Sequence, residues 1–388
     1  MIYTLDENSH KTGLAQARGI LARIDWKLLL YALPITIAGL VTMQSYDGGS
    51  MLFYRQVAWL GVSLLVFFAL AFLDTSVLKK TSVIVGIFLS FILMLVLVLF
   101  IGRTANGAQS WFAIGPFSMQ PSDFAKLALI LILAKYFTRR HVAIGQIKHL
   151  FISGAYMVIP FALILLQPDF GTTIILGLIW LGMAIVAGIR KRHLALLFGA
   201  AAIGFVILWS FVFAPYQKAR ITSFISPLSD IHGAGYNARQ AVIAVGSGEV
   251  FGKGVGYGTQ SRLRFLPEYQ TDFIFAAFAE EWGFVGAILL LILFGLLIAR
   301  ILAISIHGES NFETLFCAGV AIMFVAHITI NVGMNMGILP VTGITLPFMS
   351  YGGSHLIMEF AALGILSSMS RNTRKSHPED LTREFEGL

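Results

Sequence analysis

Ten long apolar runs constrain the fold of this chain more than any other feature of its sequence. A transmembrane helix needs roughly 20 mostly apolar residues. Runs near that length cover residues 28–46, 52–73, 82–101, 123–137, 150–166, 172–189, 194–213, 282–305, 313–334 and 355–369. Only 12% of the 388 residues are charged, about half the share in soluble globular proteins. Lipid must therefore cover the apolar surface, and the sequence predicts an all-α polytopic integral membrane protein with about ten transmembrane helices.

The distribution of Lys and Arg predicts which helix ends face the cytoplasm, because short loops rich in these residues stay on that side. With ten spans, 17 of the 27 Lys and Arg fall on one side, most of them in 1–27, 74–81, 138–149, 190–193 and 370–388. We expect cytoplasmic tails at 1–27 and 370–388 and a membrane domain at 28–369. A long extracytoplasmic loop, 214–271, would join the seventh and eighth helices. Charge spread in this way argues against a nucleic-acid-binding surface.

Residues 14–27 have the pattern of a helix that lies in the membrane interface. Apolar and basic side chains share this segment at helical spacing: Leu14, Arg18, Ile20, Leu21, Arg23, Ile24 and Lys27. The alternative is a solvated basic tail that only fixes the topology.

Two carboxylates and a lysine stand at helix ends on the expected outer side, where ionisable groups near a span are functional candidates. Asp123 and Lys126 are three residues apart, so one helical face carries both and they can form an ion pair. That pair either only orients its helix or leaves Lys126 to bind a phosphate. Asp169 precedes the next run and is expected to cap its helix.

The ninth and tenth runs carry further polar side chains in helical register. His327, Asn331 and Asn335 recur every four residues and form a stripe, which we expect to hydrogen-bond neighbouring helices. His355 and Glu359 share a face of the last helix, and helix packing is their expected role too. The segment PVTGITLPFMSYGGS lies between these helices, and irregular backbone at that depth must line a cavity or be buried in protein.

The 58-residue stretch 214–271 holds the densest set of candidate site residues. Residues 235–245 have helical periodicity, and five glycines from Gly246 to Gly256 would let backbone amides approach an anion. Asp272 follows, immediately before an apolar run. A carboxylate at the mouth of a cationic cavity is the arrangement expected of an acid or base beside a phosphate. Four cations would surround that cavity: Arg220, Lys253, Arg262 and Arg264.

Several motifs occur together in an order found in one known family. They are FYRQ at 53–56, GAQSWFAIG, QPSDFAK, QPDFGT, the glycine-rich loop with GTQS, FLPEYQTDFIFA with AEEWGFVG, and PVTGITLPFMSYGGS. In these motifs, from about residue 26 to 370, the chain resembles the SEDS (shape, elongation, division and sporulation) peptidoglycan glycosyltransferases. GSG and GTQS are similar to the RodA (rod shape-determining protein) branch, whereas the division branch, FtsW, usually has an Asn-Ser pair in place of Gly-Thr.

The resemblance implies a ten-helix fold that polymerises lipid II, a disaccharide-pentapeptide on undecaprenyl pyrophosphate, into glycan strands during cell elongation and rod-shape maintenance. Asp272 matches the family's essential acidic residue and is expected to be the general base. The substrate-binding residues expected from the family and from their neighbours are Arg55, Asp123, Lys126, Asp169, Arg220, Lys253 and Arg262. Two positions depart from the family: Asp123 stands where Glu is usual, and Ser110 stands where Arg is usual.

The resemblance also implies a multi-pass protein of the bacterial cytoplasmic (inner) membrane, with partners. These are a class B penicillin-binding protein transpeptidase and other membrane proteins of the elongation complex. The transpeptidase is expected beside the eighth to tenth helices, where 287–299 is nearly uncharged. No cofactor is expected, a divalent cation is left open, and the lone Cys317 excludes a Cys-based metal cluster.

Two other functions stay open at this point. A lipid II flippase or another transporter also places charges inside a bundle, and a non-catalytic scaffold would only recruit a cell-wall synthase. A transporter predicts polar groups through both leaflets, whereas the polar motifs here lie mostly at the outer ends of the helices. That pattern favours chemistry at the outer surface.

Overall fold

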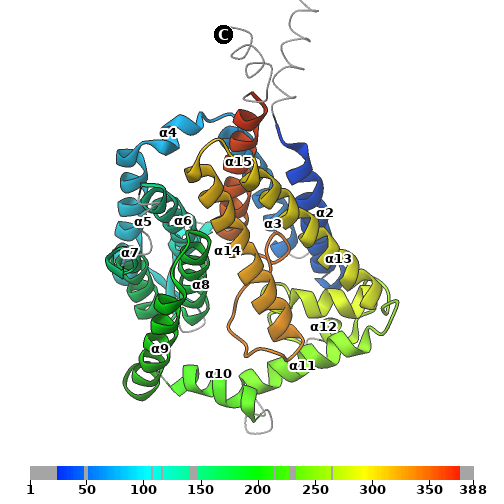
Figure 1. Cartoon of the computed structure of the whole chain (residues 1–388). Coiled ribbons are helices and arrows are strands. Elements are labelled where there is room, and N and C mark those ends of the chain that lie inside the picture. Colours follow the sequence, from blue (N-terminus) through cyan, green and yellow to red (C-terminus); the bar gives the residue numbers. More distant parts are fainter. Residues whose placement is uncertain are drawn as a thin grey trace, which may run out of the picture.

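The computed structural model describes residues 24–47, 51–105, 108–114, 117–139, 147–213, 215–226, 233–263 and 265–375. Most of the predicted interfacial segment 14–27 lies outside these residues. The helices (Figure 1) are α2 (Trp26–Asp47), α3 (Met51–Ala71), α4 (Thr75–Lys79), α5 (Thr81–Ile101), α6 (Pro121–Arg139), α7 (Ile147–Leu166), α8 (Phe170–Val186), α9 (Lys191–Ile207), α10 (Pro215–Ile225), α11 (Ala234–Ser247), α12 (Thr259–Arg262), α13 (Ile274–Ile306), α14 (Asn311–Asn335) and α15 (Gly353–Lys375). A π-helical turn, Leu208–Val212, continues α9.

Each of the ten apolar runs coincides with a helix, which confirms the helical prediction. In chain order they are α2, α3, α5, α6, α7, α8, α9, α13, α14 and α15. Within the described residues, seven helices are long and apolar enough to cross a membrane: α2, α3, α5, α7, α9 with its π-helical turn, α13 and α14. α8 is apolar but shorter. α6 and α15 are less apolar because they direct polar side chains toward each other inside the bundle.

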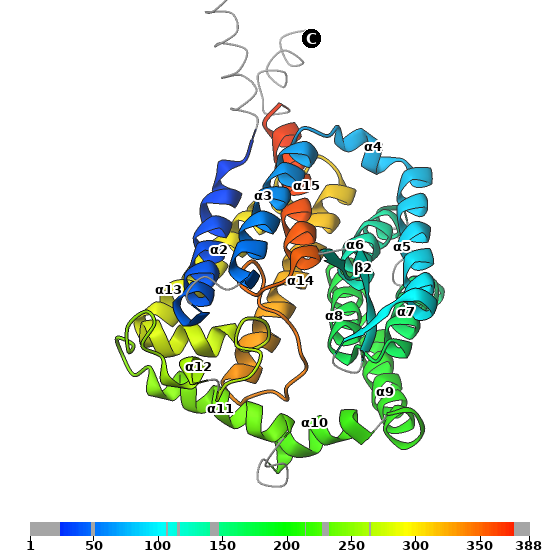
Figure 2. The same ribbon diagram turned by 180° about the vertical axis from the view of Figure 1, so that it is seen from behind.

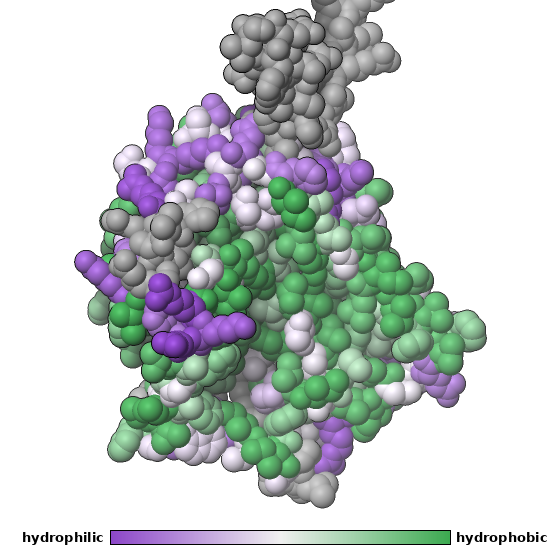
Figure 3. All heavy atoms as spheres, in the orientation of Figure 1, coloured by the Kyte–Doolittle hydropathy of each residue, from purple (hydrophilic) through white to green (hydrophobic). Residues whose placement is uncertain are grey.

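The bundle is built around α6 and α14, whose residues are mostly buried. α15 packs along α3, α13 packs against α2 and α14, and α8 packs against α6, α7 and α14 (Figures 1 and 2). α9 lies at the edge, and none of its residues is buried. A broad apolar band covers the face seen in Figure 3, while hydrophilic residues gather at the end where α2 begins and α15 ends. This band is the surface that the sequence assigns to lipid.

The opposite end of the molecule carries a layer of three helices from the long loop. α10, α11 and α12 run across the ends of the bundle helices there (Figure 1). α11 spans Ala234–Ser247 and so confirms the helical periodicity of residues 235–245.

α13 begins at Ile274, eight residues before the predicted start of the eighth helix at 282. The helix is broken at Gly283, whose φ of 66° and ψ of −167° are open to glycine alone. The loop segment 249–254 pairs with the backbone on both sides of the break. Four hydrogen bonds join them: Phe284 N to Glu249 O at 2.9 Å, Val285 N to Val250 O at 3.1 Å, Lys253 N to Glu280 O at 3.0 Å and Gly254 N to Glu281 O at 3.0 Å.

A small antiparallel sheet after α5 was not predicted. Its strands are β1 (Arg103–Ala105), β2 (Ala108–Ile114) and β3 (Phe117–Met119), in the order β1-β2-β3. Arg103 pairs with Trp111, and Phe112 pairs with Met119. β1 and β3 have three residues each, too few for an alternating pattern to stand out in the sequence.

The first and last described helices are tied together at the end where α2 begins. The guanidinium of Arg300 on α13 pairs with the buried carboxylate of Asp25, with Nε 3.0 Å from Oδ2. The Ser370 hydroxyl on α15 donates to the same carboxylate at 2.8 Å. The Asp25 amide donates to Ser367 Oγ at 3.0 Å. These contacts form a clasp between α2, α13 and α15.

Candidate active site

Asp272 lies in the turn just before α13, with a partly buried side chain. Its backbone carbonyl accepts two hydrogen bonds, from Asn331 Nδ2 and Asn335 Nδ2, each at 3.0 Å. Asn335 Oδ1 in turn accepts from the amide of Ala276, in the first turn of α13, at 3.2 Å. Two buried side chains of α14 therefore hold both the turn with Asp272 and the start of the helix that follows.

The residues before Asp272 are held as firmly, by the segment between α14 and α15. Ser350 Oγ donates to the carbonyl of Thr271 at 2.7 Å. The amide of Tyr351 donates to the carbonyl of Gln270 at 2.8 Å. Three consecutive carbonyls, at 270–272, thus have donors from other parts of the chain. The backbone that presents the Asp272 carboxylate is rigidly placed.

Lys126 and Asp123 form the ion pair that their spacing predicts. Lys126 Nζ lies 3.0 Å from Asp123 Oδ1, and the two residues are 2% and 5% exposed. Asp123 has further donors on α15: Ser354 Oγ at 2.8 Å from Oδ2, and His355 Nδ1 at 3.2 Å from Oδ1. The Asp123 carboxylate is therefore not dependent on Lys126 alone for its neutralisation.

His355 also faces the predicted partner on its own helix. Its Nε2 lies 2.9 Å from Glu359 Oε1, and the other oxygen of Glu359 accepts the amide of Phe348 at 2.8 Å. With His355 protonated, Lys126 and His355 balance the charges of Asp123 and Glu359. A balanced set of charges is the arrangement that a buried ionic cluster requires.

His327 connects this cluster to α14. Its Nε2 lies 3.4 Å from Lys126 Nζ, and its Nδ1 lies 3.3 Å from the carbonyl of Thr345. The stripe His327–Asn331–Asn335 was predicted to join neighbouring helices. Besides Lys126, the stripe contacts backbone groups outside α14. These are the carbonyls of Asp272, Ile344 and Thr345 and the amide of Ala276.

Asp169 caps α8, as predicted. Its Oδ1 accepts the amide of Thr172 at 3.0 Å, and its Oδ2 accepts Gln120 Nε2 at 3.1 Å. Desolvation raises the pKa of the Asp169 carboxyl, and the hydrogen bond from Thr172 opposes that shift. These bonds give Asp169 a structural role at the junction of α7 and α8.

Lys253 is paired with a carboxylate of α13. Its Nζ lies 2.8 Å from Glu280 Oε1 and 2.9 Å from Thr259 Oγ1. The buried Glu280 also accepts from Thr259 Oγ1 and from the amide of Gln260, both at 3.1 Å. This network fastens the long loop to α13.

The glycine amides of this loop donate to groups of the protein itself, and Gly256 does face an anion, the carboxylate of Glu281. Gly248, Gly252, Gly254 and Gly256 donate their amides to Val245 O, Gly248 O, Glu281 O and Glu281 Oε1, respectively. Gly252 has a φ of +80°, and a Cβ there would lie 2.1 Å from the carbonyl oxygen of Glu281. The glycines allow the loop to approach α13 closely.

The predicted arginines come from separate elements of the fold. Arg55 lies on α3, is partly buried, and has no ion pair among the described side chains. Arg262 is exposed at the end of α12. The side chain of Arg220 on α10, and the whole of Arg264, lie outside the described residues. Among the residues described, no group of three or more His, Cys, Asp or Glu side chains could hold a metal ion.

Sequence reasoning missed the residues that position Asp272. Asn331 and Asn335 stood out by their spacing, but that spacing does not show that both donate to the Asp272 carbonyl. Ser350 and Glu280 gave no periodic signal. Their contacts join residues 79 and 20 or more positions apart in the chain, so a local pattern could not reveal them.

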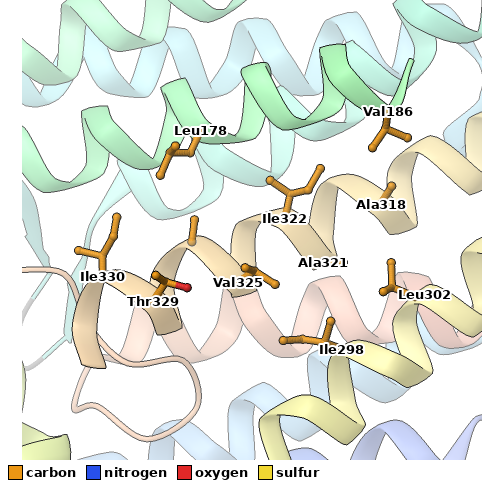
Figure 4. A pocket seen from close by; sticks show the side chains of 11 residues that line it. Leu178, Val186, Ile298, Leu302, Ala318, Ala321, Ile322, Val325, Thr329 and Ile330 are labelled. Atoms are coloured by element: carbon orange, nitrogen blue, oxygen red, sulfur yellow. The ribbon is translucent and has the colours of Figure 1, made fainter. Parts of the chain in front are cut away.

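An apolar groove opens on the side of the bundle, between α8, α13 and α14 (Figure 4). Its volume is about 460 Å³. The lining residues are Leu178, Val186, Ile298, Leu302, Ala318, Ala321, Ile322, Val325, Ala326, Thr329 and Ile330. Small residues on α14 form part of its floor, and such residues allow close helix packing in a membrane.

The family model FTSW_RODA_SPOVE, described as cell cycle protein, matches residues 22–375. The chain belongs to this family, the SEDS family. It is a multi-pass membrane protein. Stage V sporulation protein E of Bacillus subtilis is 36% identical over 362 residues, which are 90% of this chain and 98% of that protein. Peptidoglycan glycosyltransferase MrdB of Escherichia coli is 35% identical over 347 residues, 89% of this chain and 93% of that protein.

Solved structures share the SEDS fold. A chain from a peptidoglycan synthase complex that coordinates polymerization and crosslinking matches with a TM-score of 0.78 and 32% identity. That match covers 91% of this chain and 99% of the other. Rod shape determining protein RodA of Thermus thermophilus matches with a TM-score of 0.68 and 32% identity, over 90% of this chain and 97% of that protein.

Proposed function

We propose that this SEDS protein polymerises lipid II into glycan strands at the outer face of the bacterial cytoplasmic membrane. It is a peptidoglycan glycosyltransferase, as its curated relatives MrdB and FtsW are named. The observation that carries the proposal is the placement of Asp272. The residue stands at the start of α13 on a backbone held by α14, and the same helix contacts the buried Lys126.

The proposed topology has ten crossings and cytoplasmic ends. α10, α11 and α12 would then lie outside, at the end of the bundle where Asp272 precedes α13. Two features support this arrangement: the distribution of Lys and Arg, and the clasp that brings α2 and α15 to one end.

In the proposed reaction, the Asp272 carboxylate accepts the proton of the 4-hydroxyl on the acceptor sugar. The hydroxyl oxygen forms a bond to the anomeric carbon of the donor. The bond from that carbon to the phosphate oxygen breaks, and undecaprenyl pyrophosphate leaves with the bonding electrons. Cations must stabilise that leaving group. We assign this role to Lys126, with Arg55, Arg220 and Arg262, while Lys253 and Asp169 hold the loop and α8 in place.

The decisive experiment uses purified protein with labelled lipid II in detergent. Asp272→Asn keeps nearly the same size but cannot accept the proton, so polymerisation should fall by roughly a hundred- to ten-thousand-fold. Glu268→Gln is the matched control. Glu268 is an exposed carboxylate of the same turn region that accepts from Thr271 Oγ1 at 3.0 Å, and the Gln oxygen can keep this bond, so the rate should be unchanged. A folded Asp272→Asn variant that polymerises at the wild-type rate would remove the catalytic assignment.

The same assay separates the two alternatives. A flippase or a scaffold makes no polymer in detergent, where there are no sides of a membrane to transport between. Wild-type protein that forms no polymer, with or without a partner, would favour one of these functions.

We also assign the chain to the elongation branch. The motifs GSG and GTQS, which resemble the RodA branch, support this assignment. The apolar groove between α8, α13 and α14 is the proposed site of the single membrane helix of a class B penicillin-binding protein. The match to a chain in a peptidoglycan synthase complex supports a partner of this kind.

A further inference from the structure

Three buried side chains on one face of α14 contact two different parts of the proposed site. His327, Asn331 and Asn335 are 3%, 0% and 0% exposed. His327 contacts Lys126, the proposed phosphate-binding cation, at 3.4 Å. Asn331 and Asn335 donate to the carbonyl of Asp272, the proposed base, at 3.0 Å. The three are successive members of one polar stripe, the α14 stripe.

The donor and acceptor roles of its neighbours determine where His327 carries its proton. A lysine ammonium can only donate and a carbonyl oxygen can only accept. Nδ1 of His327 must therefore carry a proton toward Thr345 O, and the lone pair of Nε2 must face Lys126. The imidazole is then neutral, and the Lys126 ammonium remains a full positive charge.

The amide orientation of the asparagines follows in the same way. Asn335 Oδ1 accepts from Ala276 N, so its Nδ2 is the atom that faces the Asp272 carbonyl. Asn331 Nδ2 donates to both Asp272 O at 3.0 Å and Ile344 O at 2.7 Å. Each asparagine thus joins the Asp272 turn to another fixed segment.

The spacing along α14 is set by helix geometry. A residue rises about 1.5 Å along the axis, so four residues separate their attachment points by about 6 Å. Within α14 the backbone φ and ψ show no break of the kind seen in α13. One rigid helix therefore carries the contacts to both the base and the cation.

We propose that the α14 stripe is the positioning element that sets the distance between the Asp272 base and the Lys126 cation. This inference rests on the proposed function and adds three positioning residues to it. Neither His327 nor the asparagines touch substrate in this proposal. Their effect is that the acceptor hydroxyl and the donor pyrophosphate meet their protein partners in one geometry, which a transferase needs for an aligned attack.

The test uses two amide replacements of one histidine. The Asn side chain places its amide near the position of imidazole Nδ1, and the Gln side chain places its amide near Nε2. His327→Gln keeps an acceptor for Lys126, whereas His327→Asn keeps the donor to Thr345 O and loses the contact with Lys126. We expect His327→Asn to raise the KM for lipid II roughly tenfold with kcat within about twofold, and His327→Gln to keep KM within about threefold.

Substitution of the asparagines should instead lower kcat and leave KM nearly unchanged. Asn331→Ala and Asn335→Ala free the Asp272 carbonyl, so each should lower kcat roughly tenfold with KM within about twofold. Asn335→Ser keeps a short hydroxyl donor and serves where the alanine variant does not fold. Asn311→Ala, at an exposed position of the same helix, should change neither parameter. Thermal unfolding of each variant checks that it is folded.

Equal effects of His327→Gln and His327→Asn on KM, or parallel loss of kcat and KM in the asparagine variants, would overturn the positioning role. The proposed function would survive that result if Asp272→Asn is inactive and Lys126→Met raises KM. If Lys126→Met leaves KM unchanged, Lys126 does not bind the substrate phosphate. The α14 stripe then has no role in positioning a phosphate-binding cation.

Discussion

Lys126 is almost completely buried in the described structure, yet its positive charge can still attract a second anion. Its partner Asp123 has two further donors, Ser354 and His355. Its other neighbour, His327, offers only a lone pair. A substrate phosphate could therefore attract the ammonium without leaving the Asp123 carboxylate bare, which would otherwise be a costly state for a buried anion.

This arrangement separates binding from stability. Lys126→Met retains much of the side-chain volume and removes the charge. His355 and Ser354 still serve Asp123, but the buried cluster loses one of its two positive charges, so we expect the melting temperature to fall by several degrees without loss of the fold. The KM for lipid II should rise roughly ten- to a hundredfold, the range expected for losing a hydrogen bond to a charged group. Steady-state polymerisation and thermal unfolding in detergent measure the two quantities.

Lys135→Met is the control for this experiment. Lys135 lies on the same helix, at the opposite end, and donates to the carbonyl of Lys79. It should leave KM unchanged. A Lys126→Met variant with a strongly lowered melting temperature and a normal KM would show that the ion pair only stabilises the bundle.

At the scale of elements, glycines allow the backbone of the long loop to pack directly against the backbone of α13. Gly283 opens the helix, and the segment 249–254 supplies the missing hydrogen-bond partners. Lys253 then closes the junction through Glu280. Since Asp272 lies about three turns before Gly283, the loop and the proposed base are fixed to the same short piece of helix.

We expect Gly252→Ala to open this junction. The new Cβ would meet the carbonyl of Glu281, and the positive φ is strained for alanine, at roughly 1–2 kcal/mol for the backbone alone. The variant should unfold at a lower temperature, and limited proteolysis should cut the 248–263 region faster.

Gly295→Ala provides the comparison within α13. Nothing lies within 4 Å of a Cβ at that position, and alanine is favoured over glycine inside a helix by roughly 1 kcal/mol. This variant should be as stable as the wild type or slightly more stable. Equal protease sensitivity of the Gly252→Ala variant and the wild type would contradict the proposed junction.

The elements themselves were largely readable from the sequence, because a membrane span is a local property of about 20 residues. The Asp123–Lys126 pair and the cap at Asp169 were readable for the same reason, since each depends on spacing within a few positions. The glycines of the long loop indicate a close approach, but the sequence does not show that the approaching groups belong to α13. The targets of Asn331 and Ser350 depend on tertiary packing, which no local pattern contains.

At the scale of the whole molecule, the apolar groove makes one side of the bundle suited to another helix. It has an apolar lining, with exposed Val325 and Thr329 beside the buried Ala318 and Ala321. In lipid, packing of small residues drives helix association more than apolarity does. The groove therefore favours a partner helix over bulk lipid.

We expect Val325→Trp to fill the groove and block the partner. Co-purification of a class B penicillin-binding protein should be lost, while polymerisation by the isolated protein stays at the wild-type rate. The partner should raise the rate of the wild-type protein by shifting the 214–271 loop, and this increase should disappear in the variant. Val158→Trp, at a valine of α7 that is also exposed, is the control and should retain both.

The identity of the co-purified protein also tests the proposed elongation branch. Capture of the division protein alone would contradict the elongation assignment. A stable complex with an unchanged polymerisation rate would support the groove as the partner's binding site and contradict activation by the partner.

The clasp of Asp25, Arg300 and Ser370 has a consequence for biosynthesis. At roughly 5–20 residues per second, the 275 positions between Asp25 and Arg300 take on the order of 14–55 seconds to translate. During that interval α2 is already made, but the Asp25 carboxylate has neither Arg300 nor Ser370, the two side chains that neutralise and hold it. The ribosome must therefore deliver nearly the whole chain before this clasp can close, and α2 waits in the membrane for partners that are made last.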